Sequence, residues 1–290
     1  QLRRLQVDLQ GRFLDPRVSF RLRLDSSNGG TLSPAYAWVG FQPTGAVDLR
    51  VGQLKPPFLA EENVSGAMAL AVERAYVNDY FTVDFTQGAV LSWRPSPRLQ
   101  LAGSVHSGSY AMRTDFDNDG TAVALAGRAE YLLAGGQPAR GWRLLTDWSC
   151  WPQEAAAARL GAAVDWERGQ SAGAGNLPDL LKWTLDASAQ WAGTGLAVAA
   201  MGQALAVRGL PAAPVPARLD GARQLGLVAQ ASRFVVPGRL EPLVRAEWLD
   251  FDGVYYRANL GTVHGDSEDL AGDDRLALLT VGANWYLQQH

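Results

Sequence analysis

Residues 17–25 carry the pattern that most constrains the fold of this chain, because apolar and polar side chains alternate at every position. Val18, Phe20, Leu22 and Leu24 would share one face of a β-strand, since successive side chains of a strand point to opposite faces. The other face would carry three arginines. A buried strand of a soluble sandwich seldom has such a face, whereas a strand between lipid and a watery lumen does. The segment therefore predicts a transmembrane β-barrel.

The same alternation recurs along the chain, between clusters of Gly, Pro, Asp and Asn that mark turns. It predicts thirteen strands, or fourteen if residues 135–157 form one more; we favour an irregular turn there. We expect strands at residues 2–13, 17–26, 35–42, 47–55, 88–96, 98–108, 122–133, 158–168, 182–192, 196–208, 223–235, 240–250 and 275–287.

The connections between these strands are alternately short and long. Short periplasmic turns and longer outer loops are typical of an outer-membrane barrel, and a soluble sandwich has no reason to keep that order. The short connections centre on residues 15, 44, 96, 194 and 238, and the long ones are 27–34, 56–87, 109–121, 169–181, 209–222 and 251–273.

Tryptophans lie near the expected strand ends, where a barrel has its aromatic girdles; scattered core tryptophans are the alternative interpretation. They are Trp93, Trp166, Trp183, Trp191, Trp248 and Trp285.

Composition is compatible with a barrel and excludes a helical membrane protein. The chain is 47% apolar and 19% charged, so it can fold, and it has no run of about 18 uncharged apolar residues. A net charge of −3 does not indicate nucleic-acid binding. Cys150 is the single cysteine, which excludes an internal disulfide. Arginine dominates the basic residues, with Lys55 and Lys182 the only lysines; an anion-attracting lumen and a GC-rich genome both explain that bias.

Strand parity places arginines and acids together on the polar face. If this face lines a lumen, its guanidinium groups would attract anions through charge-assisted hydrogen bonds. The alternative is a mutually neutralised wall that holds the barrel rigid without selectivity. The polar-face residues are Arg4, Arg12, Arg21, Arg23, Arg50, Arg94, Arg128 and Arg245, with Asp8, Asp25, Asp48, Glu130, Asp165, Asp186 and Glu247.

Residues 56–84 interrupt the strand rhythm, and Glu61 to Arg74 has helical spacing with few β-formers. The strand end before this segment reads Val-Gly-Gln-Leu-Lys-Pro-Pro-Phe (residues 51–58), and the pair Glu73-Arg74 follows. Together these resemble the phosphate-selective porins of the porin O and porin P type. Gly127-Arg128 and the late strand Val-Gly-Ala-Asn-Trp-Tyr-Leu (residues 281–287) resemble further elements of that family, in the same order.

The resemblance implies a sixteen-stranded outer-membrane barrel, usually trimeric, with loops folded inward to narrow the pore. Lys55 to Arg74 would begin the constriction loop, with Lys55, Glu73 and Arg74 as its charged residues; Glu73-Arg74 could equally be an ion pair that anchors the loop. By the family pattern one strand would precede Gln1 and two would follow His290. We therefore expect residues 1–290 to form a single barrel domain of 14–16 strands. The alternatives are that the terminal strands of the family barrel are present or that they are missing from these residues. The family relies on clustered lysines for phosphate selectivity, and this chain lacks them.

Two weaker motifs complete the candidate sites. Asp115, Asp117 and Asp119, followed by Gly120, match the first half of a calcium loop. The bidentate Glu expected at position twelve is replaced by Ala126, so a simple polar outer loop is the competing interpretation. The three histidines, His106, His264 and His290, share no ligand spacing and read as solvent or lumen residues.

The sequence therefore predicts a passive pore of the bacterial outer membrane for small hydrophilic solutes, mildly anion-preferring, with phosphate-like anions implied by the resemblance. The pore-lining arginines would be Arg21, Arg23, Arg50, Arg74, Arg128 and Arg245. We expect lipid, lipopolysaccharide and small anions as partners, a homotrimer or a subunit of an outer-membrane assembly, no nucleic acid, no enzymatic activity and no cofactor apart from the weak calcium motif. The alternatives are a plugged barrel that scaffolds a membrane assembly and a soluble all-β binding protein.

Overall fold

The fold is taken from a computed structural model. It describes residues 5–26, 32–64, 66–109, 111, 121–135, 148, 156–169, 171–172, 175–176, 178–206, 220–254 and 274–287.

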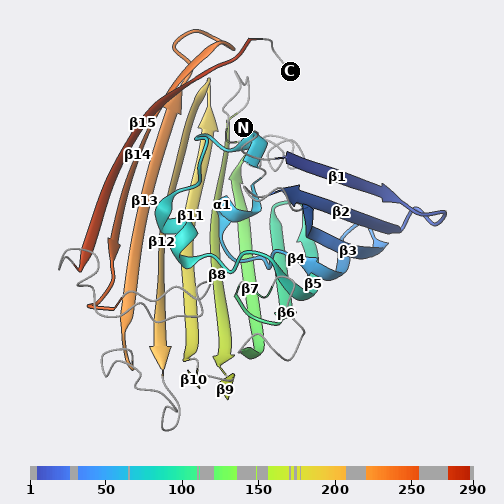
Figure 1. The fold of residues 1–290 in the computed structure, drawn as a ribbon. Coiled ribbons are helices and arrows are strands. Elements are labelled where there is room, and N and C mark those ends of the chain that lie inside the picture. Colours follow the sequence, from blue (N-terminus) through green and yellow to red (C-terminus); the bar gives the residue numbers. More distant parts are fainter. Residues whose placement is uncertain are drawn as a thin grey trace.

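Thirteen strands form one antiparallel sheet in which each strand pairs with the next along the chain, so the topology is up-and-down (Figure 1). The sheet is open between its edge strands β1 and β15, each of which pairs with a single neighbour among the described residues. A small hairpin, β9 (Ser171–Ala172) with β10 (Gly175–Asn176), stands apart from the sheet. The sheet strands are β1 (Leu5–Arg12), β2 (Val18–Ser26), β3 (Leu32–Thr44), β4 (Val47–Leu54), β5 (Thr86–Ser96), β6 (Leu99–His106), β7 (Thr121–Ala134), β8 (Ala157–Gly169), β11 (Asp179–Trp191), β12 (Thr194–Ala206), β13 (Arg223–Arg233), β14 (Leu240–Asp250) and β15 (Arg275–Trp285).

Apolar side chains face outward from the sheet and polar ones face inward, as the alternation predicts. In β11 the side chain of Leu185 is 58% exposed, whereas its neighbours Thr184 and Asp186 are 1% and 8% exposed. The strands β8 and β14 alternate in the same way. A soluble sandwich buries its apolar face, so this inverted arrangement is that of a sheet whose outer face contacts lipid. The fold-class prediction, an all-β up-and-down membrane sheet, is confirmed.

The tryptophans lie in two rows at opposite ends of the strands. Near the short turns, Trp93, Trp191 and Trp285 are exposed on the outer face. Near the long connections, Trp183 of β11 lies two positions from the cross-strand pair of Leu181 with Trp166. This separation is the arrangement expected of two aromatic girdles at the membrane interfaces.

The β11–β12 connection shows how the sequence closes a tight turn. Ala192 and Gly193 are its two central residues, and their φ angles are +46° and +72°. Positive φ at both positions is typical of a type I′ turn, whose twist matches that of the strands. Glycine adopts this conformation without steric cost.

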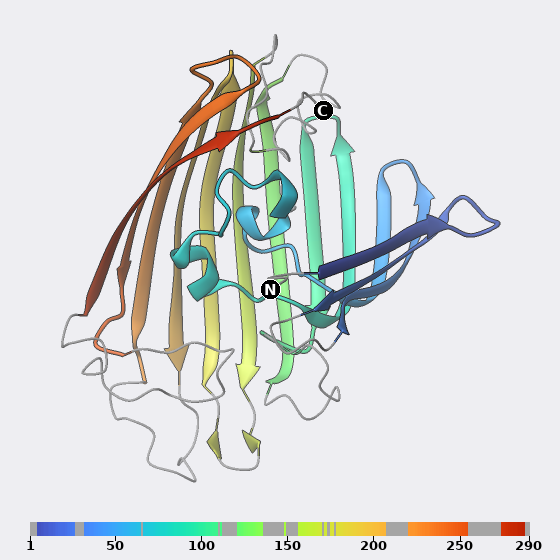
Figure 2. The same cartoon turned by 45° about the horizontal axis from the view of Figure 1, so that its top comes forward.

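Three short helices lie on the concave side of the sheet, where Figure 2 shows them enclosed by the curve of the strands. They are α1 (Ala60–Asn63), the 3-10 helix η1 (Gly66–Met68) and α2 (Tyr76–Phe81). None of the helices in the described ranges is long and apolar enough to cross a membrane.

The partly helical loop expected near residues 56–84 is confirmed, because α1, η1 and α2 all lie within it. One local expectation was wrong. Residues 169–180, expected as a loop, contain β9, β10 and the start of β11. The described residues contain the thirteen sheet strands that the alternation predicts, whereas the family resemblance implies sixteen. The uncertain segment 135–157 lies largely outside the described residues.

Candidate pore and constriction site

Residues 55–85, called here the lumen insert, leave the wall after β4 and return to it at β5. The insert packs against the inner face of β12–β14, where Val77 and Phe81 of α2 lie over Gly226. Its apolar residues join wall residues such as Met201 and Leu249 in one buried cluster. The inward face of these strands is therefore apolar where the insert covers it and polar elsewhere.

Two buried arginines of the wall fasten the insert. Arg245 Nη1 donates to the Glu73 carbonyl at 3.0 Å, and its Nη2 lies 3.2 Å from Glu61 Oε1. Arg128 Nη1 donates to the Phe58 carbonyl at 2.9 Å, while its Nη2 donates to Asp186 Oδ1 at 2.8 Å. Both guanidinium groups thus have protein partners.

Further polar contacts hold the insert at other points. The backbone N–H of Val77 donates to Glu247 Oε2 at 3.0 Å, and Asn284 Nδ2 donates to the Leu70 carbonyl at 2.9 Å. Arg74 donates to the Val64 carbonyl at 3.1 Å within the insert. These bonds tie the insert to β14 and β15 and give it a fixed position across the lumen.

Between the insert and strands β1–β6, the inner wall is not covered, and two polar cavities remain. The first, called here the turn-side cleft, has a volume of 540 Å³ and borders the β3–β4 turn at Gly45 and Ala46. It is lined by six cationic and only two acidic side chains. The cations are Arg12, Arg50, Lys55, Arg94, Arg128 and Arg159, and the acids are Asp48 and Glu130.

The second cavity, called here the loop-side cleft, has a volume of 600 Å³ and lies toward the opposite ends of the strands. Its four cations are balanced by five acids, so its charge is close to neutral. The cations are Arg21, Arg23, Lys55 and Arg74, and the acids are Asp25, Glu62, Glu73, Asp79 and Asp84.

Aromatic rings support several of the arginines that face the clefts. The guanidinium carbons of Arg21 and Arg23 lie 4.3 and 4.8 Å from the centre of the Tyr36 ring. Arg50 lies 4.9 Å from the centre of the Trp38 ring. Such stacking stabilises a guanidinium group while its N–H groups remain able to bind an anion.

Lys55 occupies a special position, because it lines both clefts together with Asn63 and Val64. Its ammonium contacts Glu62 and lies 3.1 Å from Asp84. Burial lowers the pKa of Lys55 to about 8, although Asp84 opposes this shift. Burial raises the pKa of Glu61, although Arg245 opposes that shift.

The structure thus separates the predicted pore-lining residues into two groups. Arg21, Arg23, Arg50 and Arg74 face the clefts, with Lys55 and Glu73 beside them. Arg128 borders the turn-side cleft but is only 6% exposed, and Arg245, 3% exposed, lies behind the insert and lines neither cleft.

A buried ionisable cluster escaped the sequence reasoning. His106 Nε2 lies 2.9 Å from Asp165 Oδ2, and Lys182 Nζ lies 2.8 Å from Glu167 Oε1. Ser109 contacts both Lys182 and Glu167, so the cluster fixes the segment after β6 to the wall. His106 is 1% exposed, which corrects its interpretation as a solvent or lumen residue. Strand parity alone predicted the inward position of Asp165.

The three aspartates of the calcium motif, Asp115, Asp117 and Asp119, lie outside the described residues, as do His264 and His290. Within the described ranges, His, Cys, Asp and Glu side chains form no group of three or more that could hold a metal ion.

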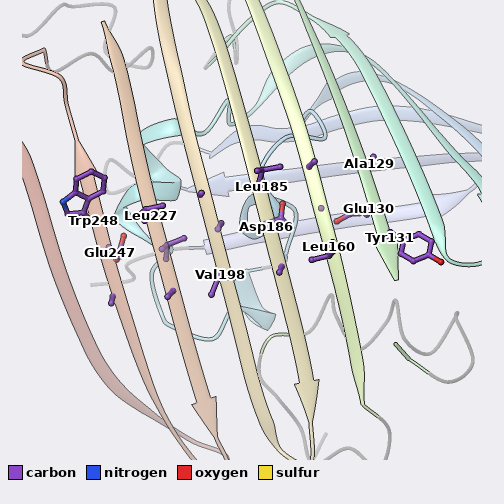
Figure 3. Close-up of a pocket in the computed structure, with 18 of the residues that line it drawn as sticks. Ala129, Glu130, Tyr131, Leu160, Leu185, Asp186, Val198, Leu227, Glu247 and Trp248 are labelled. Atoms are coloured by element: carbon purple, nitrogen blue, oxygen red, sulfur yellow. The ribbon is translucent and has the colours of Figure 1, made fainter. Parts of the chain in front are cut away.

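The outer face of the sheet carries an apolar groove of 860 Å³ across β7, β8 and β11–β14. Figure 3 shows its apolar side chains spread over the strands, with the insert behind the sheet. The three acids that border it are turned to the lumen. Asp186 binds Arg128, Glu130 accepts from Arg128 and Arg159, and Glu247 accepts from the Val77 N–H. The groove is thus part of the lipid-facing surface and separate from the clefts. Its large side chains are Tyr131, Leu160, Leu185, Val198, Leu227 and Trp248.

Comparison with known proteins agrees with this architecture. Residues 1–139 match the family model "Phosphate-selective porin O and P". The outer membrane channel DcaP of Acinetobacter baumannii has a similar structure, with a TM-score of 0.56 and 12% identity, over 98% of this chain and 74% of that chain.

Two further structures are less similar. A loop L8 deletion mutant of OmpT, an outer membrane protein of Vibrio cholerae, gives a TM-score of 0.47 at 7% identity, over 97% of this chain and 89% of its own. An anion-selective porin from Comamonas acidovorans gives a TM-score of 0.40 at 10% identity, over 84% of this chain and 78% of its own. A search of curated proteins gives no match. The chain has the fold of an outer-membrane channel, and its residues 1–139 match the model of the phosphate-selective porin O and P family.

Proposed function

We propose that this protein is a porin of the bacterial outer membrane, through which small hydrophilic solutes diffuse passively with a preference for anions. The observation that carries the anion preference is the charge of the turn-side cleft, where six cationic side chains face two acidic ones. An excess of fixed positive charge in a narrow aqueous space raises the local concentration of anions and lowers that of cations.

The geometry also supports release of the anion after entry. Arg50 lies 2.7 Å from Asp48, so an anion must compete with a carboxylate for this guanidinium. Conduction requires binding that favours entry but is weak enough for departure. Guanidinium forks fit carboxylate and phosphate groups, so small oxyanions, phosphate-like ions included, are the solutes that we propose.

Transport of this kind requires no catalytic group and no cofactor, and we propose neither for this chain. We further propose that the protein assembles as a homotrimer among lipid and lipopolysaccharide, which the family resemblance implies. Chemical crosslinking of the protein in outer-membrane fragments measures this directly, and a purely monomeric species would contradict it.

Reversal potentials in planar bilayers test the function. With a KCl gradient across the membrane, the wild-type protein should give a reversal potential of the sign that marks anion preference. The variant Arg50→Glu should reduce that preference or invert it, because it reverses one charge inside the turn-side cleft. The matched control is Arg17→Glu, since Arg17 pairs with Asp15 in the β1–β2 turn and lines neither cleft.

The measurement also separates the competing functions. Cation preference would overturn the anion assignment while leaving a pore. A correctly folded protein that passes no current would instead favour the plugged, scaffolding barrel.

A further inference from the structure

The two clefts lie one after the other along the strands. On β1, Arg12 lines the turn-side cleft and Gln6 lines the loop-side cleft. On β3 the corresponding residues are Gln42 and Tyr36. Lys55 lines both cavities, so they meet beside the insert. A solute that crosses the lumen on this side therefore passes first through one cleft and then through the other.

The charge changes along this path. Cations exceed acids by four in the turn-side cleft, whereas acids exceed cations by one in the loop-side cleft. In the loop-side cleft the cations are matched closely, since Arg23 lies 3.0 Å from Asp25 and Arg21 donates to Asp8 at 3.0 Å.

The turn-side cleft differs because part of its positive charge has no local partner. Arg12 and Arg94 are exposed and form no ion pair with any residue in the described part of the chain. The fixed charge of the path is thus concentrated at the short-turn end of the barrel.

We infer that this charge step makes the pore rectify, so that it conducts better at one polarity than at the other. The inference rests on the proposed function, because it requires an open pore. When the loop side is held positive, anions move from the turn-side cleft into the loop-side cleft. Cations that enter from the loop side are repelled by the positive charge of the turn-side cleft. Anions and cations therefore both accumulate in the loop-side cleft, and the conductance rises. At the opposite polarity both ions are drawn away and the conductance falls.

The effect depends on screening, which provides the first measurement. The Debye length is about 10 Å at 0.1 M salt and about 3 Å at 1 M. Current–voltage curves in symmetric KCl should show about twofold more current with the loop side positive at about 0.1 M, and nearly equal currents at about 1 M.

The orientation of each inserted protein is determined with a marker on the β1–β2 turn. Leu14 is fully exposed and lines neither cleft, so Leu14→Cys in a Cys150→Ser background accepts biotin without disturbing the pore. Streptavidin added to one chamber then perturbs the current only when the short turns face that chamber. The polarity of rectification is assigned relative to this side.

The double variant Arg12→Gln/Arg94→Gln removes the two unpaired cations, and the ratio of currents should fall toward one. The matched control Arg17→Gln/Arg98→Gln removes two exposed arginines at the same turns that line neither cleft, and it should keep the wild-type ratio. A linear curve for a conducting, anion-selective wild type overturns the inference and leaves the proposed function standing. Equal loss in both double variants, or rectification of the opposite polarity, also overturns it. Absence of conductance overturns the proposed function as well.

Discussion

Gly226 lies directly beneath Val77, and a Cβ atom placed on Gly226 would approach Val77 Cγ1 to 2.4 Å. The same added Cβ atom would lie 2.7 Å from Phe81 Cε2. The absence of a side chain at this position of β13 is therefore what lets α2 sit against the wall. Close packing of the insert against the wall therefore helps to narrow the lumen.

Replacing Gly226 by valine should force α2 away from the wall. Overpacking of this kind typically costs about 1–3 kcal/mol, so the free energy of unfolding should fall by that amount in urea titrations of the detergent-solubilised protein. The control is Gly127→Val on β7, where a Cβ meets no atom within 4 Å. Equal stability of the two variants would show that α2 does not depend on this contact.

Arg245 provides the polar part of the same attachment. Replacing it by methionine leaves Glu61 buried without its cation, and breaking a buried ion pair typically costs about 3–5 kcal/mol. The free energy of unfolding of the detergent-solubilised protein should fall by that amount in urea titrations. Arg275→Met is the control, because Arg275 pairs with Asp250 at the surface, is 71% exposed, and should cost less than about 1 kcal/mol. A loss for Arg245→Met as small as that of the control would mean that Glu61 finds another partner.

The sequence predicted the strands where one face meets lipid and the other meets water. In β11 the alternation holds from Leu181 to Trp191, because each face has one kind of surroundings over that length. In β12 it is blurred, since Met201 is apolar on the inward face. Its partner is the insert, which is distant in sequence, so no local pattern could indicate that contact.

The candidate site was only partly predictable for the same reason. Strand parity correctly placed Arg50 and Arg245 on the inward face, because parity depends only on the local sequence. It could not distinguish them, because Arg50 faces a cleft while Arg245 lies under the insert. Lys182 and His106 were missed as cluster members, since they are brought together by β6 and β11, which are not adjacent strands.

The outward orientation of Leu185 predicts a depth-dependent cost for charge. Arginine at the bilayer midplane of a barrel costs about 2–4 kcal/mol, and near the interfaces about 0–1. Leu185→Arg, in the middle of β11, should therefore reduce stability in lipid vesicles by several-fold more than Leu181→Arg near the loop-side end of the same strand. Both leucines are exposed on the outer face, so the substitutions are matched. Equal costs would contradict the assignment of this face to the hydrocarbon.

Lys55 makes the anion preference dependent on pH. Because burial lowers its pKa to about 8, the ammonium is charged below that pH and loses its proton above it. Arginine stays charged throughout this range, so Lys55 is the cation of the two clefts that titrates. The reversal potential in a KCl gradient should therefore show weaker anion preference as the pH rises from about 7 to about 9. Lys55→Arg keeps the charge and should remove this dependence, whereas an unchanged pH profile in that variant would assign the titration to a different group.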